Sequence, residues 1–273
     1  MTRADSPIVR RARSAARPPA RETVRHPAAA ELDPETTALF LDIDGTLLEI
    51  AATPMSVRVE PGTVELLRRL HARLDGALAL ISGRPIADVD RLFAPLRLPT
   101  AGQHGTERRD GDGRFHRHDA PLIALDRLRG GIARFAAATP GVLVEDKGLS
   151  IAVHYRLAPL QASRIREFLE QALRESDDDL GLQAGKMVLE VKPTGRNKGT
   201  AIAEFLAEAP FRGRIPAFLG DDVTDEFGFE TVSGRGGYAV KIGDGETCAP
   251  WRLDGVAATR AWLERLCSDG AAP

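Results

Sequence analysis

Short apolar runs alternate with amphipathic stretches along most of the chain from residue 38 onward. The runs have the length and composition of buried strands, and the stretches between them repeat their apolar residues with the period of a helix. The predicted strands are 38–41, 78–81, 99–102 and 215–219. The predicted helices are 62–74, 86–93, one from about 198, one from about 224, and 257–266. This alternation predicts an α/β fold with a parallel sheet covered by helices.

The pattern changes between residues 108 and 191. Asp-Gly turns in RRDGDGRF are followed by a helical stretch, two strands, a second helix and a short strand pair. The expected helices are 122–137 and 160–174, and the expected strands are 142–145, 149–155, 180–183 and 187–191. An αββαββ unit of this kind predicts an open-faced sheet inserted into the parallel one. We therefore expect a core domain from 33–107 and 192–273, and a cap domain at 108–191.

The first thirty-two residues form a third region. Arginines are scattered among alanines and prolines there, and the prolines would interrupt any helix. An acid-poor, Arg-rich leader could be a targeting signal, but the segment has no apolar centre and no regular amphipathic pattern. The favoured interpretation of 1–32 is a disordered tail.

Composition and charge narrow the classes of partner. A formal net charge of -2 gives no global reason to expect nucleic acid or an anionic membrane surface. No apolar run is long enough to span a bilayer. Cys248 and Cys267 have no metal-type spacing, which indicates a reducing compartment without a disulfide framework. We expect a cytoplasmic monomer that acts on a small molecule.

Reactive polar groups stand where the predicted strands and helices meet. Asp42 and Asp44 follow the first strand, Ser82 follows the second, Lys198 begins a helix, and Asp221 ends a later strand. Ligands of an open parallel sheet gather beyond the carboxyl ends of its strands. Separated segments are therefore expected to converge on one edge.

These residue types suit phosphoryl transfer through a covalent aspartyl phosphate. Asp42 is placed to attack phosphorus, and Asp44 to protonate the departing alkoxide and then deprotonate water. Ser82 would bind the phosphate, and Lys198 would neutralise its charge. A Mg²⁺ ion held by Asp42, the Asp44 carbonyl and Asp221 would remove the repulsion between carboxylate and phosphate.

The acidic residues after Asp221 fit the same hypothesis. Asp222 and Asp225 are expected to support the metal site without contacting the substrate. A Ca²⁺-binding EF-hand is the competing interpretation of DIDG, but it needs glycine at position six and glutamate at position twelve of the loop. Here Gly45 is at four and Thr53 at twelve, so that alternative fails.

The motifs DIDGT, ISGR, NKG and GDDVTDE occur in this order, and with them the chain resembles phosphatases of the haloacid dehalogenase superfamily. Within it, GQHG at 102–105, VEDKGLSIAVHYR at 144–156 and GKMVLEVKP at 185–193 resemble the trehalose-6-phosphate phosphatases. The resemblance covers about 38–268. It implies a Rossmann-like core, Mg²⁺, and a mobile cap that closes over a phosphorylated disaccharide, yielding trehalose and phosphate. The catalytic and metal residues proposed above fall on the matching positions.

The cap is expected to bind the sugar. Period-two alternation turns Met187, Leu189 and Val191 toward the cap's own core, and Lys186, Val188 and Glu190 toward the open face. Glu145 and Lys147 share one face of their strand, as do Ser150, Ala152 and His154. A face that mixes donors and acceptors suits a polyhydroxyl ligand, and with aromatics at 5% a stacked nucleotide does not fit. The competing interpretation is a set of salt bridges on a solvated sheet.

The predicted substrate contacts come from both domains. On the core side they are Asp42, Ile43, Asp44, Arg84 and Asn197; on the cap side they are Glu145, Lys147, Lys186 and Glu190. The rival activities are a phosphatase of another sugar phosphate, such as sucrose or glucosylglycerol phosphate, a phosphosugar mutase, and a non-catalytic binding module. The complete set of nucleophile, acid, lysine and metal ligands argues against the last.

Overall fold

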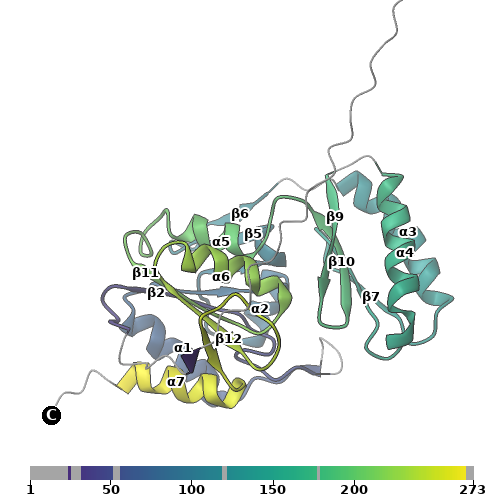
Figure 1. Ribbon diagram of the computed structural model, residues 1–273. Coiled ribbons are helices and arrows are strands. Elements are labelled where there is room, and N and C mark those ends of the chain that lie inside the picture. The colour runs from purple at the N-terminus through teal and green to yellow at the C-terminus, as the bar shows by residue number, and fades with distance from the viewer. Residues whose placement is uncertain (1–23, 26–31, 52–55, 119–121, 177–178, 269–273) are drawn as a thin grey trace, which may run out of the picture.

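The protein consists of two units, each built on one β-sheet, in the computed structural model shown in Figure 1. The structure describes residues 24–25, 32–51, 56–118, 122–176 and 179–268. The larger unit, the core, holds a nine-stranded sheet in the order β1-β13-β12-β11-β2-β3-β4-β5-β6. Its strands are β1 Val24–Arg25, β2 Thr37–Leu41, β3 Leu78–Ile81, β4 Thr100–Gly102, β5 Glu107–Arg109, β6 Phe115–Arg117, β11 Ile215–Gly220, β12 Tyr238–Ile242 and β13 Trp251–Leu253.

The middle of this sheet is parallel and buried on both faces. Every residue of β2 is buried, and β2 pairs in parallel with β11 on one side and β3 on the other. A continuous apolar run is what a strand needs when helices cover both faces of its sheet. The helices of the core are α1 Pro61–Arg73, α2 Ile86–Leu92, α5 Lys198–Phe205, α6 Glu226–Ser233 and α7 Val256–Ser268.

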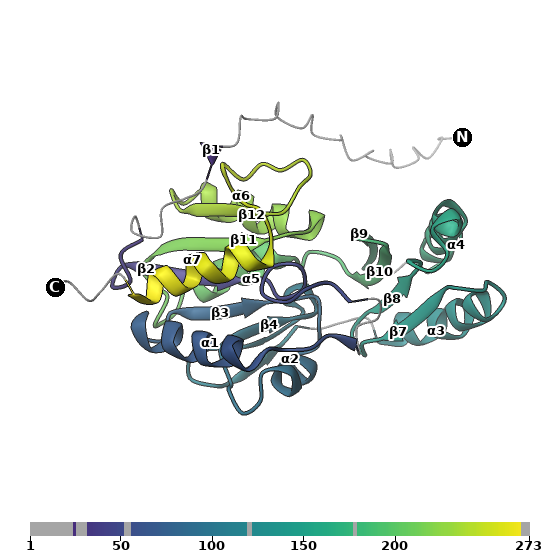
Figure 2. The same ribbon diagram turned by 90° about the horizontal axis from the view of Figure 1, so that it is seen from below.

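Two helix pairs form the outer layers of the core. Helices α1 and α7 pack against each other below the sheet, and α5 and α6 pack together above it (Figure 1). Figure 2, seen from below, shows α7 and α1 in front of the sheet, running roughly alongside its strands. The mostly parallel sheet and its helical layers confirm the predicted α/β core.

The smaller unit, the cap, lies between β6 and α5 in the chain. Its sheet has the order β7-β8-β10-β9, and its two helices cover the face that points away from the core (Figure 1). The elements are α3 Leu122–Ala137, β7 Leu143–Asp146, β8 Ile151–His154, α4 Ala162–Arg174, β9 Leu180–Gly185 and β10 Val188–Pro193. This is the predicted αββαββ order. Leu189 and Val191 are buried as expected, but Met187 is 38% exposed because it lies in the hairpin turn between β9 and β10.

The first boundary of the cap differs from the expected one. Strands β5 and β6 form an antiparallel hairpin that pairs with β4 and so extends the core sheet. The segment from residue 108 to 117 therefore belongs to the core, and the cap's first element is α3. The Asp-Gly turn that suggested a new domain is the turn of this hairpin. Such a turn can stand either at a domain boundary or within a hairpin of the same sheet, so it does not distinguish the two.

The strands at one edge of the core sheet, β1, β13 and β12, were not predicted from the sequence. Strand β1, within the expected tail, pairs in parallel with β13. Leu32, also placed in that tail, is 4% exposed and belongs to the core cluster. The expectation of disorder otherwise falls on residues 1–23 and 26–31, which lie outside the described part of the chain. Within that described part, no helix is long and apolar enough to cross a membrane.

Candidate active site

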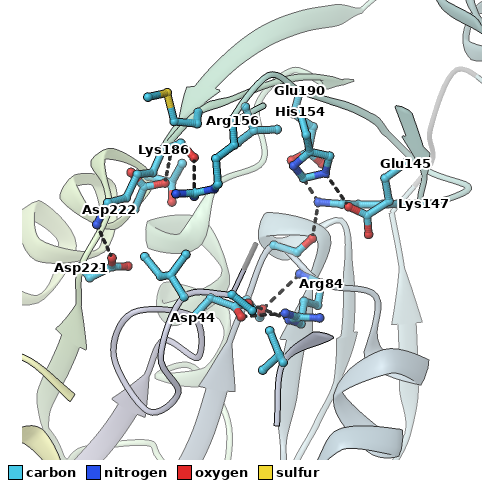
Figure 3. A pocket seen from close by; sticks show the side chains of 18 of the residues that line it. Asp44, Arg84, Glu145, Lys147, His154, Arg156, Lys186, Glu190, Asp221 and Asp222 are labelled. Carbon is cyan, nitrogen blue, oxygen red and sulfur yellow. Dashed lines mark hydrogen bonds and ion pairs between the residues drawn. The ribbon is translucent and has the colours of Figure 1, made fainter. Parts of the chain in front are cut away.

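The predicted catalytic residues of the core gather at one edge of its sheet. Asp42 directly follows β2, Ser82 follows β3, Asp221 follows β11, and Lys198 is the first residue of α5. With Asp44, they line one cavity that opens between the core and the cap (Figure 3). The structure thus brings these five residues together, as expected for the carboxyl ends of parallel strands.

Lys198 lies in a buried ion-pair cluster. Its Nζ is 2.7 Å from Asp42 Oδ1 and 2.6 Å from Asp225 Oδ1, and the Lys198 residue is 3% exposed. Burial alone would lower the pKa of Lys198, but the carboxylates of Asp225 and Asp42 outweigh it and raise this pKa above its usual range. The lysine therefore stays positively charged beside the position where a phosphate would meet Asp42.

The acidic groups of this cluster suit a divalent cation. Asp42, Asp221 and Asp225 each offer a carboxylate oxygen, and these oxygens lie within 4.8 Å of one another. Burial, with the charge of Asp225, raises the pKa of Asp221 to about 6. Three carboxylates share the buried ammonium of Lys198 and the more exposed one of Lys186, so further positive charge would favour their ionised forms. An all-oxygen donor set is the one that Mg²⁺ prefers, and the residues present fit that ion.

Glycine is required in the turn beside this cluster. Gly45 has φ +89°, and a Cβ built on it would lie 2.1 Å from Asp221 Oδ2. The turn after β2 can therefore pack directly on the Asp221 carboxylate only because no side chain intervenes. Lys186 of the cap reaches the same group, with its Nζ 3.7 Å from Asp221 Oδ2.

The Asp44 side chain points away from the three carboxylates and toward Arg84. Arg84 Nε and Nη2 donate to Asp44 Oδ2 and Oδ1 at 2.6 and 2.7 Å, a bidentate pair drawn in Figure 3. The Arg84 amide donates to Ser82 Oγ at 3.1 Å. The Asp44 carboxylate is therefore held by Arg84 at the cavity, and the predicted metal set uses only the backbone carbonyl of Asp44.

The loop after β11 is held by its own acids. Asp225 Oδ2 accepts from the Asp222 amide at 2.8 Å, and Asp222 Oδ1 accepts from the Val223 amide at 2.7 Å. Asp225 is fully buried. Both residues therefore fix the segment that carries Asp221, and Asp225 also anchors Lys198, while their roles at a metal site stay a prediction.

The cap presents alternating donors and acceptors to the cavity. His154 Nε2 lies 2.8 Å from Glu145 Oε2, and Lys147 Nζ lies 3.3 Å from Glu190 Oε2. Burial alone would raise the pKa of Glu190, but the Lys147 ammonium and the hydrogen bonds from His104 and Ser150 hold it well below its usual range. The cap face of the site is therefore charged at neutral pH.

Two predicted substrate contacts have other observed partners. Ile43 is fully buried in the core, and its carbonyl accepts from the amides of Leu47 and Leu48. Asn197 caps α5: its Oδ1 accepts from the Thr200 amide at 2.9 Å, and Thr200 Oγ1 accepts from the Asn197 amide at 3.1 Å. Neither residue is among those that line the cavity, so their contact with substrate stays a prediction.

Some residues of the cavity were not in the predicted set. His104, His154, Arg156 and Leu157 all line it. Alternation along β8 placed His154 on the open face, but its hydrogen bond with Glu145 depends on the register between β7 and β8. His104 is part of the motif GQHG at 102–105, and this motif was the sequence signal that could have identified it.

Comparison with known proteins covers both the core and the cap. The sequence profile of the trehalose-phosphatase family matches residues 40–257. The chain is 46% identical over 216 residues to a probable trehalose-phosphate phosphatase of Sinorhizobium fredii, covering 79% of this chain and 81% of that protein. It is 45% identical over 229 residues to trehalose-6-phosphate phosphatase of Escherichia coli, covering 84% and 86%. A crystal structure of a trehalose-6-phosphate phosphatase related protein matches with a TM-score of 0.73 and 27% identity, covering 85% of this chain and 97% of that one.

Proposed function

The chain belongs to the trehalose-phosphatase family of phosphoric monoester hydrolases, and from this premise we propose that it converts trehalose 6-phosphate to trehalose and phosphate. The observation that carries the proposal is the single cavity with two chemically different walls. Its core wall holds Asp42, Asp44 and Lys198, and its cap wall holds Glu145 and Lys147. The first set suits phosphoryl transfer, and the second suits the hydroxyl groups of a sugar.

The proposed reaction has two steps. In the first, an Asp42 oxygen attacks phosphorus, the bond from phosphorus to the sugar oxygen breaks, and the Asp44 carboxylic acid protonates the departing alkoxide. In the second, Asp44 takes a proton from water, which attacks phosphorus and releases inorganic phosphate and the free Asp42 carboxylate. Ser82 and Lys198 hold the phosphoryl oxygens in both steps.

The proposed cofactor is Mg²⁺. The carboxylates of Asp42 and Asp221 and the backbone carbonyl of Asp44 would hold it, with Asp222 and Asp225 fixing the loop. When bound, the ion would reduce the repulsion between the attacking carboxylate and the phosphate dianion. The excess of negative charge in this cluster supports the assignment.

The remote glucose ring is proposed to lie against the cap. Glu145 and Lys147 come from the β7–β8 hairpin and Lys186 and Glu190 from the β9–β10 hairpin, and all four line the same cavity (Figure 3). Hydrogen bonds to the sugar would favour the arrangement in which the cap covers the phosphate and excludes water.

A phosphate-release screen tests this function. Purified protein is incubated with trehalose 6-phosphate, sucrose 6-phosphate, glucosylglycerol phosphate and glucose 6-phosphate, with and without Mg²⁺. We expect fastest release from trehalose 6-phosphate, and only with the metal. Faster release from another ester would identify that ester, and not trehalose 6-phosphate, as the substrate. Phosphate transfer between sugar hydroxyls that requires a bisphosphate activator would indicate a mutase, and no turnover at all would indicate a binding module.

A further inference from the structure

The turn after β4 has an unusual backbone. Gln103 and His104 have φ of 47° and 55°, and Gly105 follows with φ of 94°. Residues with side chains rarely adopt this left-handed conformation, and two in succession persist only where the surrounding structure holds them. Such strain collects at functional sites, which directs attention to what this turn contacts.

The turn holds the segment that carries Ser82. The Gln103 amide donates to the Arg84 carbonyl at 3.0 Å, and the His104 amide donates to the Ser82 carbonyl at 2.9 Å. The carbonyl between them, that of Gly83, accepts from Lys147 Nζ at 2.8 Å. Three successive carbonyls of the proposed phosphate-binding segment are thus held, two by the core turn and one by the cap.

The His104 side chain continues this connection into the cap. Its ring packs on Gly83, where an added Cβ would lie 2.7 Å from the ring atoms Cε1 and Nε2. Its Nε2 is 3.1 Å from Glu190 Oε2. Within the described residues, Nδ1 is buried without a hydrogen-bond partner. Burial lowers the pKa of His104, so the ring is neutral and its proton lies on Nε2, which donates to the carboxylate.

Glu190 is oriented by three side chains. Ser150 Oγ donates to Glu190 Oε1 at 2.5 Å, while His104 and Lys147 share Oε2. Glu190 is 4% exposed yet lines the cavity. Of these three side chains, only His104 comes from the core. His104 therefore ties Glu190 to the proposed phosphate-binding segment from the core side, whereas Lys147, which contacts both Glu190 and the Gly83 carbonyl, does so from the cap side.

We propose that His104 is a positioning residue, which fixes the Glu190 carboxylate and so couples the placement of the cap on the sugar to the segment Ser82–Arg84. This proposal rests on the proposed function, because Glu190 is one of the residues assigned there to the sugar. A substrate that reaches the cap uses this coupling. A small phosphate ester that touches only the core wall does not.

Replacing His104 with asparagine or glutamine distinguishes a positioning role of this residue from a purely structural one. The terminal NH₂ of glutamine reaches the place of the imidazole Nε2, whereas that of asparagine reaches only the place of Nδ1. Asparagine also tolerates a left-handed backbone, so His104→Asn removes the hydrogen bond without adding strain. We expect His104→Asn to lower kcat/KM for trehalose 6-phosphate by ~10- to 100-fold, mainly through KM, and to lower that for p-nitrophenyl phosphate several times less. His104→Gln should restore most of the loss.

The same measurements can overturn the proposal. Equal losses on both esters, or a glutamine variant as impaired as the asparagine variant, would make His104 a structural residue. Unchanged kinetics in His104→Asn would show that Glu190 needs no support from the core. Melting temperatures of both variants identify a general loss of folding. If the wild type prefers another sugar phosphate, the proposed function fails, but the ratio measured with that ester still tests His104.

Discussion

At the scale of single residues, Lys198 is the group on which the buried charges depend. Replacing it with methionine would leave Asp42 and Asp225 facing each other without a cation. Because removing one partner of a buried ion pair costs ~3–5 kcal/mol, we expect Lys198→Met to lower the urea midpoint clearly. Phosphate release should fall by a factor of ~100 to 1,000. Lys186→Met, at a side chain that is 58% exposed, is the stability control. Equal midpoints for the two variants would contradict this account.

A second prediction concerns the contact between Gly45 and Asp221. Gly45→Ala adds a methyl group where the Asp221 carboxylate lies, so the carboxylate must move. We expect the Mg²⁺ concentration for half-maximal activity to rise by ~10- to 100-fold, as when other supports of a metal ligand are disturbed. Gly113→Ala is a matched control, because Gly113 has φ +82° and no atom within 4 Å of an added Cβ. If the Mg²⁺ concentration for half-maximal activity rose similarly in both variants, the effect would come from placing alanine at a positive φ and not from the contact with Asp221.

Residue chemistry at strand ends was predictable, but contacts that depend on three-dimensional register were not. Asp42, Ser82 and Asp221 stand directly after apolar runs, so the edge where they meet followed from the alternation of strands and helices. The contact between Glu190 and His104 was not predicted. Its partner His104 is far away in the chain and lies in a turn whose backbone conformation no hydrophobic pattern encodes.

At the scale of elements, the start of α5 links stability to catalysis. Asn197 forms a capping box with Thr200, and the next residue is Lys198. Loss of such a cap costs ~0.5–2 kcal/mol, so Asn197→Ala should lower the urea midpoint and Asn197→Ser should retain most of the stability. If Asn197 also binds substrate, the serine variant will show a raised KM despite normal unfolding. A serine variant as unstable as the alanine variant would argue against the cap.

Elements were predictable where their periodicity was long. The helices of the cap and the buried strands of the core follow from repeated apolar positions. Strand β13 is three residues long and β5 is Glu-Arg-Arg, so neither carries a pattern that identifies it. Met187 does not lie on the predicted face, because it is a turn residue with a positive φ and the alternation of side chains holds only within a strand.

At the scale of the whole molecule, the charges between core and cap predict acid sensitivity. The ordinary pKa of histidine is 6.5, and burial lowers that of His104, with Lys192 and Lys147 adding to the shift and Glu190 opposing it. At His104 the unfolded chain then binds a proton more readily than the folded protein, so the contribution of His104 to stability is lost as the pH drops through 6.5. The depressed pKa of Glu190 adds a further loss below its ordinary value of 4.5.

Urea unfolding between pH 8 and pH 5.5 measures the first of these effects. We expect the midpoint of His104→Asn to rise relative to that of the wild type as the pH falls over this range, because asparagine does not titrate. The control is His116→Asn, since His116 is also paired with a carboxylate, Asp110, but lies in the core hairpin away from the cap. An identical pH slope in the wild type and His104→Asn would exclude His104 as the source.

The position of β2 between β3 and β11 has a consequence for synthesis of the protein on the ribosome. The strand that leads to Asp42 emerges early with β3, but the whole cap must follow before β11 is made. Until then one side of β2 has no partner, and Asp221, which follows β11, has not yet joined Asp42. A product of premature termination anywhere before α5 would therefore expose an unpaired apolar strand, a substrate for chaperones and proteases. The order of the chain thus delays assembly of the proposed active site until most of the polypeptide has been made.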